Sequence, residues 1–139
     1  MLKRAAMTTD DLLYYYQSVI RPVTEYGCVV WHTSLTVEQS KHIESIQQRA
    51  IKIIYSNNND EMTHALDSIP TLSDRRDKLT RQFYNGLTDP SSCLHHLIPP
   101  KRDSQVTLRL RHTRQYSPPR ARTERFKNST IVYALNNYQ

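Results

Sequence analysis

The chain has 139 residues and a formal net charge of +6 at pH 7, which is enough length for one ordinary domain and too little for two. It contains only two glycines, Gly27 and Gly86, which argues against any activity built on a glycine-rich phosphate loop and disfavours turn-rich β sandwiches and barrels. Leu, Ile, Val and Phe make up 31 residues, or 22% of the chain, close to the ~20% at which a core becomes hard to fill. We therefore expect an all-α fold, a small irregular bundle of roughly four to five helices cut from something larger.

Charge is distributed unevenly along the chain. Residues 1–70 hold 6 basic and 8 acidic residues, a net charge of −2, whereas residues 71–139 hold 13 and 5, a net charge of +8. Within 101–127, 9 basic residues are balanced only by Asp103 and Glu124. Such one-sided charge indicates a phosphate-bearing or acidic partner. The sequence contains neither 18 consecutive apolar residues nor an apolar secretory signal, so we expect no membrane partner and an intracellular location.

Thr8, Thr9 and Asp10 predict the start of a first helix, because Thr and Asp side chains accept hydrogen bonds from the early amides of a helix. Apolar and aromatic residues then recur at helical spacing on one face: Leu12, Leu13, Tyr16, Val19 and Ile20. Pro22 has no N–H and disfavours helical geometry at Arg21, so a break or kink is predicted there, or a bend if the helix continues. A second short helix is expected over about 23–31.

The strongest helical pattern covers residues 37–55. Thr36 and Gln39 fit a capping box, in which each side chain accepts a hydrogen bond from the other residue's main-chain N–H. The apolar stripe of this helix consists of Ile43, Ile46, Ala50, Ile53 and Ile54, and we expect part of it to face a partner outside the chain.

Three shorter helices are expected farther along the chain. One covers 61–68 after Asp60 and another covers 74–87 after Ser73 or Asp74, since these residue types cap helix starts. Beyond residue 100 apolar anchors become rare, which predicts an Arg-rich, largely extended tail with a short terminal helix over about 129–137. The sequence is therefore divided into a helical region, 1–98, and a basic tail, 99–139.

No residue pattern in the chain supports catalysis. The adjacent aspartates Asp10 and Asp11 precede a helix, where acids favour the positive end of the helix dipole, so we interpret them as capping residues. Two small clusters have metal-compatible spacing, Cys28 with His32 and Cys93 with His95 and His96. Because a structural zinc site needs about four ligands, we interpret the thiols as buried and the histidines as solvent-facing, and expect neither a metal nor a cofactor.

A short basic cluster occupies residues 75–81. It alternates with two aspartates, Asp74 and Asp77, and contains Arg75, Arg76, Lys78 and Arg81. Opposite charges three or four positions apart meet on a helix surface, so we expect local ion pairs here rather than a binding surface.

The basic tail is a candidate nucleic-acid-binding segment. Arginine pairs with phosphate and stacks on bases, and the interleaved aromatic rings of Tyr116 and Phe126 also stack. The predicted binding residues are Arg109, Arg111, Arg114, Arg120, Arg122, Arg125 and Lys127. A solvated tail without a selected partner is the alternative.

Three segments also carry longer motifs. Residues 16–31 fit the pattern YxSxIRPxxEYGxxxW, residues 43–54 fit IExxQxRAxxxI, and residues 72–79 fit LxxRRxxL. Residues 94–99 and 122–129 continue the same order. In order and spacing, over nearly all 139 residues, the chain resembles the thumb and post-palm region of non-LTR (LINE-type, jockey-like) retrotransposon reverse transcriptases.

The resemblance implies a helical, thumb-like region that contacts the template–primer or the element RNA and packs against fingers and palm. The chain has no YxDD-type palm strand and no upstream catalytic acid, so RNA-directed DNA polymerase activity is not expected of it. The leading hypothesis is a non-catalytic fragment that binds single-stranded or hybrid RNA or DNA through its tail. Two alternatives stay open: a helical protein-interaction module, and a non-functional remnant of a decayed mobile element.

Overall fold

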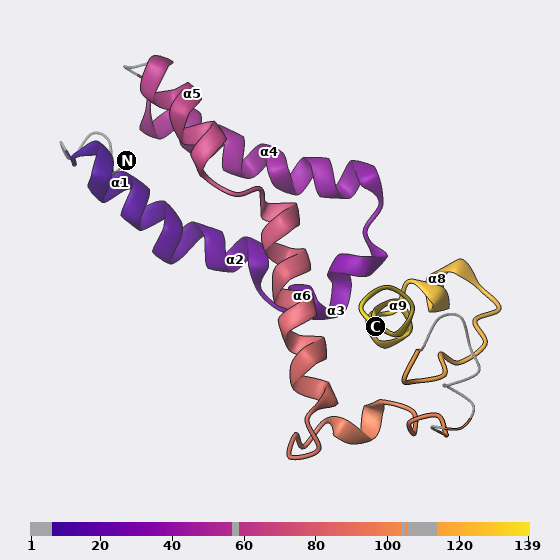
Figure 1. Cartoon of the computed structure of the whole chain (residues 1–139). Coiled ribbons are helices and arrows are strands. Elements are labelled where there is room, and N and C mark those ends of the chain that lie inside the picture. The colour runs from indigo at the N-terminus through magenta and orange to yellow at the C-terminus, as the bar shows by residue number, and fades with distance from the viewer. Residues whose placement is uncertain (1–6, 57–58, 104, 106–113) are drawn as a thin grey trace. The chain divides into compact units, whose positions relative to one another are not determined.

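The computed structural model describes residues 7–56, 59–103, 105 and 114–139 (Figure 1). Over these residues the chain is helical, and its single β feature is an isolated bridge between Lys101 and Tyr116. The predicted all-α fold is therefore confirmed. The chain divides into two compact units: unit 1 comprises Met1–Gly27 and Leu35–Arg76, and unit 2 comprises Cys28–Ser34 and Asp77–Gln139. The division that composition places after residue 98 stays a prediction.

Unit 1 begins with a helix that runs without interruption through Pro22. Its parts are α1 (Thr9–Tyr15), a π-helical turn η2 (Tyr16–Ile20) and α2 (Arg21–Glu25). The helix starts within the predicted signature, and of its residues Thr8 is the N-cap, since the Thr8 hydroxyl accepts from the Asp11 amide at 3.2 Å. The predicted break at Pro22 is wrong, because the wider π turn before it makes room for the ring, which in an α-helix clashes with the carbonyl four residues earlier.

The chain leaves the helical path at Gly27 instead. This residue has a φ of 60°, a left-handed conformation that costs glycine little and other residues considerably more. The predicted helix over 23–31 is therefore two pieces: α2 ends at Glu25, and α3 (Cys28–Trp31) begins unit 2 and is followed by the 3₁₀ turn η3 (His32–Ser34).

Helix α4 (Val37–Ile54) has the predicted capping box, with the Gln39 amide donating to the Thr36 hydroxyl and the Thr36 amide donating to the Gln39 side chain. Its buried face overlaps the predicted stripe only in part: Ile54 is buried and Ile43 and Ala50 are half-buried. Gln47, Ile51 and Ile54 are buried, whereas Ile46 and Ile53 are 46% and 53% exposed. The face turns toward Gln47 because that amide finds hydrogen-bond partners inside unit 1, as described below.

Two further helices complete the middle of the chain. Helix α5 (Asn59–Ser68) begins before Asp60, so this residue lies in the first turn rather than at the cap. Helix α6 (Leu72–Thr88) begins earlier than predicted, because the Thr71 hydroxyl, and not that of Ser73, accepts from the Asp74 amide at 3.0 Å. The residues of α6 up to Arg76 belong to unit 1, and those from Asp77 on belong to unit 2.

Each unit has its own apolar core. In unit 1, Leu12 and Tyr16 pack against Ile54 of α4. In unit 2 the core joins α6, the 3₁₀ turn η4 (His95–Leu97) and the C-terminal helix α9 (Thr130–Asn137), through Tyr84, Leu87, Ile98, Tyr116, Ala134 and Leu135. The predicted helix over about 129–137 is thus confirmed and is a core element. None of the helices in the described parts of the chain is long and apolar enough to cross a membrane.

Candidate nucleic-acid interface

Helix α8 (Glu124–Lys127) carries the last members of the predicted binding set. Thr123 caps it, since its hydroxyl accepts a hydrogen bond from the Phe126 amide at 3.2 Å. This single turn leaves Arg125, Phe126 and Lys127 exposed, and 46% of the Phe126 surface is accessible to solvent. An accessible aromatic ring between two accessible cations combines the groups that bind a base and a phosphate.

The other predicted binding residues in the described chain are also exposed: Arg114, Arg120 and Arg122. Arg114 reaches the side-chain oxygen of Asn136 at 3.5 Å, and Lys127 lies 3.5 Å from Glu124. The side chains of the Lys127–Glu124 pair are 59% and 80% exposed, so water and salt screen this pair and leave its cation available to phosphate. Arg109 and Arg111 lie outside the described residues.

A hollow of about 460 Å³ lies beside Phe126, within unit 2. Hydroxyl side chains form much of its lining: Ser34, Thr123, Ser129 and Thr130. Hydrogen bonds to main-chain carbonyls join its walls, since Thr130 donates to Val29 at 2.7 Å and Thr33 donates to Asn128 at 2.6 Å. These bonds link residues 101 and 95 positions apart, so tertiary packing forms the hollow (Figure 1 shows α3, α8 and α9).

The charge of the chain follows its structural division. Unit 2 contains 11 basic and 4 acidic residues, a net charge of +7, and unit 1 contains 8 and 9, a net charge of −1. The excess positive charge of the molecule therefore belongs to the unit that carries α8. An anionic polymer is attracted to such a unit over distances of about a Debye length, roughly 10 Å at 0.1 M salt.

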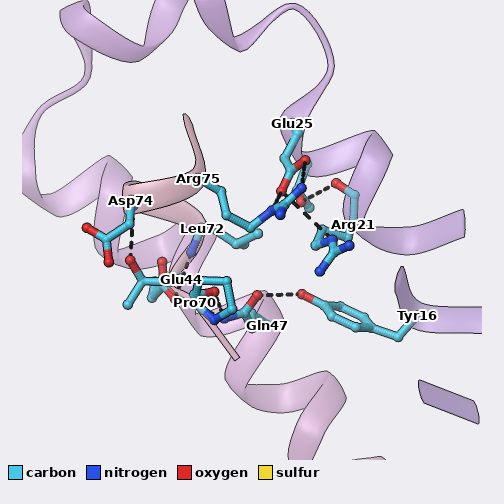
Figure 2. A network of polar contacts seen from close by, with 11 residues as sticks. Tyr16, Arg21, Glu25, Glu44, Gln47, Pro70, Leu72, Asp74 and Arg75 are labelled. Carbon is cyan, nitrogen blue, oxygen red and sulfur yellow. Dashed lines mark hydrogen bonds and ion pairs between the residues drawn. The ribbon is translucent and has the colours of Figure 1, made fainter. Parts of the chain in front are cut away.

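The motif residues of unit 1 form a different kind of polar site (Figure 2). The Tyr16 hydroxyl donates to the Gln47 side-chain oxygen at 2.8 Å, and the Gln47 amide group donates to the carbonyl of Pro70 at 3.1 Å. Glu44 accepts from the Leu72 amide at 3.3 Å. These bonds tie the first helical segment, α4 and the start of α6 to one another.

Arg75 belongs to the same network. Its guanidinium makes a two-pronged contact with Glu25, from Nε to one carboxylate oxygen and from Nη2 to the other at 3.1 Å. The hydrogen bond to Glu25 raises the pKa of Arg75 above its ordinary value and so favours the charged form. Arg21 also lies 3.9 Å from Glu25, so two guanidinium groups share one carboxylate whose side chain is 11% exposed.

The expectation of local pairing at 75–81 is wrong for two of its arginines. Arg75 pairs with Glu25, and Arg76 is fully buried, with its Nη2 donating to the Ser40 hydroxyl at 3.1 Å. It is confirmed for Arg81, which binds Asp77 at 2.7 Å. Acceptors supplied by distant segments decide the first two cases, and sequence spacing decides the third.

The Tyr16 hydroxyl is buried in this network. Desolvation raises its pKa to about 12, with the nearby Arg21 cation acting in the opposite direction. Tyr16 therefore stays a neutral hydrogen-bond donor to Gln47 throughout the physiological pH range. In the network Tyr16 thus joins the first helical segment to α4 through a neutral hydrogen bond.

The residues considered for catalysis and metal binding are Asp10 with Asp11 and the two cysteine–histidine clusters. Asp10 and Asp11 lie in the first turn of α1, as their interpretation as capping residues predicts. Cys28 is buried as expected, but Cys93 is exposed, because it lies in the turn region after α6. Within the described ranges no group of three or more His, Cys, Asp or Glu side chains is arranged to hold a metal ion.

Sequence reasoning did not predict the network of unit 1 or the hollow of unit 2. One feature of the sequence could have indicated the network: its residues are polar positions of the quoted motifs, namely Tyr16, Glu25, Glu44, Gln47 and Arg75. No such feature indicated the hollow, since its walls come from both ends of the chain. No protein-family model, curated protein or solved structure matches the chain.

Proposed function

We propose that the chain is a non-catalytic segment of a non-LTR retrotransposon reverse transcriptase, equivalent to its thumb and post-palm region, and that it binds RNA or DNA. In this proposal the cations at 114–127 bind the phosphate backbone, and the missing palm and fingers are protein partners of the helical part. Counterion release from the nucleic acid supplies much of the binding free energy.

The observation that carries the binding proposal is the side-chain set of α8. Arg125 and Lys127 flank Phe126, all three are exposed, and two further exposed cations, Arg120 and Arg122, precede them in the sequence. A merely solvated basic tail gains nothing from an exposed phenylalanine, whereas a nucleic-acid-binding segment uses the ring to stack on bases.

The network of unit 1 supports the proposed kinship. Polar residues from three motif segments, spaced up to 50 residues apart, contact one another there rather than solvent. Residues that hold helices together in this way are expected to recur as a set in a family with this fold. The reason for their recurrence would be helix packing and not catalysis.

The test measures binding of the full chain to a fluorescent single-stranded oligonucleotide as a function of salt. Replacing Arg120, Arg122, Arg125 and Lys127 by Ala is expected to weaken binding at least about tenfold at 0.1 M salt. It should also reduce the slope of log affinity against log salt by about 1 for each phosphate that the variant no longer neutralises. The charge-matched control replaces Lys41, Arg49, Lys52 and Lys78, four exposed cations elsewhere in the chain.

The control variant is expected to lose much less affinity than the α8 variant. Equal losses would mean that the oligonucleotide responds only to net charge, which contradicts an interface at 114–127. Absence of binding by the unmodified chain at low salt would contradict the proposed function itself.

A second candidate function is docking of a protein, and one surface favours it. The first helical segment exposes large apolar side chains: Tyr14, Val19, Val23 and Tyr26, which are 74%, 46%, 74% and 85% exposed. Large exposed apolar surface of this kind marks interaction sites. Co-purification of a partner that survives nuclease and high salt, and that is lost in Val19→Asp with Val23→Asp, would support this candidate.

A further inference from the structure

We infer that the hollow beside Phe126 is a subsite for a single unstacked nucleobase that carries an exocyclic amino group, so that the chain prefers single strands containing adenine, cytosine or guanine to strands of thymine or uracil. This inference rests on the proposed nucleic-acid binding and specifies what that binding recognises. It assigns the ring of Phe126 to the base and Arg125 to an adjacent phosphate.

The size and lining of the hollow fit this ligand. Its volume of about 460 Å³ lies within the range of small-molecule sites, about 300–1,000 Å³. Val30 and Phe126 supply apolar surface, while Arg125 supplies a cation at the rim. A planar, polar-edged ring next to a phosphate is the chemistry that matches an aromatic wall, a hydroxyl wall and a guanidinium together.

The hydrogen bonds of the lining decide which base edge fits. Ser129 donates its hydroxyl proton to the carbonyl of Phe126 at 2.7 Å, Thr130 donates to Val29 at 2.7 Å, and Ser34 donates to Asn128 at 3.2 Å. A hydroxyl has one proton and two lone pairs, so these three oxygens accept from a ligand while they make these bonds. The fourth hydroxyl of the lining, that of Thr123, accepts from the Phe126 amide and keeps its own proton for an acceptor of the ligand.

A wall with three acceptors and one hydroxyl donor favours a base whose polar edge joins an amino group to an acceptor, as in adenine, cytosine and guanine. Thymine and uracil present two carbonyl oxygens around a single N–H, so a carbonyl oxygen would face a hydroxyl oxygen without a proton between them. A polar group that loses its water and gains no partner costs binding free energy, so the hollow discriminates against thymine and uracil.

Base entry also requires a single strand. A base inside a duplex is stacked on its neighbours and paired on its polar edge, and must leave both to reach an aromatic side chain in a hollow. The subsite therefore predicts weaker binding of a duplex than of a single strand with the same number of phosphates.

The test uses oligonucleotides of abasic residues that carry one central base, so that the phosphate backbone stays constant while the base is varied. The full chain is expected to bind the strand with a central adenine or cytosine at least about fivefold more tightly than the all-abasic strand, because stacking on an aromatic side chain is worth ~1–3 kcal/mol per base. A central thymine should give a clearly smaller gain.

Two variants locate the effect. Phe126→Leu keeps apolar bulk but removes the ring, and is expected to abolish the gain from the central base. Tyr14→Leu, which removes an exposed ring from unit 1, is the matched control and should keep the gain. A central 2-aminopurine should lose fluorescence on binding to the unmodified chain and not to Phe126→Leu.

The outcomes separate this inference from the proposed function. Salt-dependent binding with equal affinities for abasic, adenine, cytosine and thymine strands would overturn the base subsite and leave nucleic-acid binding intact. Equal gains for thymine and adenine that vanish in Phe126→Leu would overturn the selectivity argued from the hydroxyls. No binding to any strand at low salt would overturn both.

Discussion

The arginines at the start of α6 and the arginines around α8 differ in environment although both groups are dense in the sequence. Arg75 contacts Glu25 through two nitrogens, and Arg76 is fully buried against Ser40. Arg122 and Arg125 are exposed, and the nearest acid in the sequence, Glu124, has a side chain that is 80% exposed. The first group holds unit 1 together, and the second group presents charge to solvent.

The difference shows that a run of arginine becomes structural where other segments supply acceptors. Glu25 lies 50 residues before Arg75, and Ser40 lies 36 residues before Arg76. Arg122 and Arg125 have only the hydrated Glu124 as a neighbouring acid in the sequence, so they keep their own hydration. Breaking the contact between a guanidinium and a carboxylate shielded from water lowers the free energy of unfolding strongly. Removing a guanidinium that is surrounded by water changes it little.

The largest effect is expected from removing the carboxylate that Arg75 and Arg21 share. Glu25→Ala should lower the free energy of unfolding by about 2–4 kcal/mol, because it leaves two partly shielded cations without their acid. Glu124→Ala, the matched change at α8, should alter it by less than about 0.5 kcal/mol. Chemical denaturation followed by circular dichroism measures both, and similar losses in the two variants would contradict the comparison.

A smaller effect is expected from alkaline pH at the Tyr16 hydroxyl. Below pH 10.0, the ordinary pKa of tyrosine, Tyr16 is protonated in both the folded and the unfolded chain. Between about pH 10 and the folded pKa of about 12, the unfolded chain ionises first, so roughly 3 kcal/mol of stability is lost as the pH rises through this window.

Tyr16→Phe isolates this loss from that of the other tyrosines. The variant is expected to be less stable at neutral pH by about 1–3 kcal/mol, because the Gln47 oxygen loses its donor in a buried position. Its additional loss above pH 10 should be smaller than that of the unmodified chain. Equal losses of stability above pH 10 in the two proteins would show that folding does not raise the pKa of Tyr16.

A smaller effect on stability is expected from Asp77 at acid pH. In the sequence Asp77 lies between the arginines at the start of α6 and those around α8. Burial raises the pKa of Asp77, but the hydrogen bonds from Arg81 and Tyr138 outweigh burial and hold the pKa below its ordinary value of 3.8. The stabilisation is therefore present above about pH 4 and is lost as the pH falls through the folded pKa. Because the carboxylate is 35% exposed, we expect the loss to stay below about 1 kcal/mol, measured as the acid-side difference between the unmodified chain and Asp77→Asn.

The smallest effect is expected from the α8 cations themselves. Arg122→Ala with Arg125→Ala should change the free energy of unfolding by no more than about 0.5 kcal/mol, because both side chains are exposed. The same double variant should weaken oligonucleotide binding. A clear loss of stability in thermal unfolding would place these arginines in the structural group and contradict the distinction.

The helix pattern of the chain was predictable wherever one local interaction decides it. The Thr36–Gln39 capping box follows from residues within a few positions of the start of α4. The continuation of the helix through Pro22 was not predictable from local sequence. A π turn before the proline lets the helix accommodate a residue that local rules place at a break. The stop came instead at Gly27, where the backbone adopts a positive φ.

The candidate site was predictable in its residue types and not in its form. The sequence by itself determined that the chain is helical, that its positive charge gathers toward its C-terminal end and that Phe126 stands among cations, because periodicity, charge and neighbours are local properties. Only the tertiary structure decided that Gln47 is buried in place of Ile46, that Arg75 and Arg76 serve the fold, and that a hydroxyl-lined hollow forms beside Phe126. The physical reason is that a polar side chain can be buried only where a distant segment supplies its hydrogen-bond partner, and such partners have no signature in the local sequence.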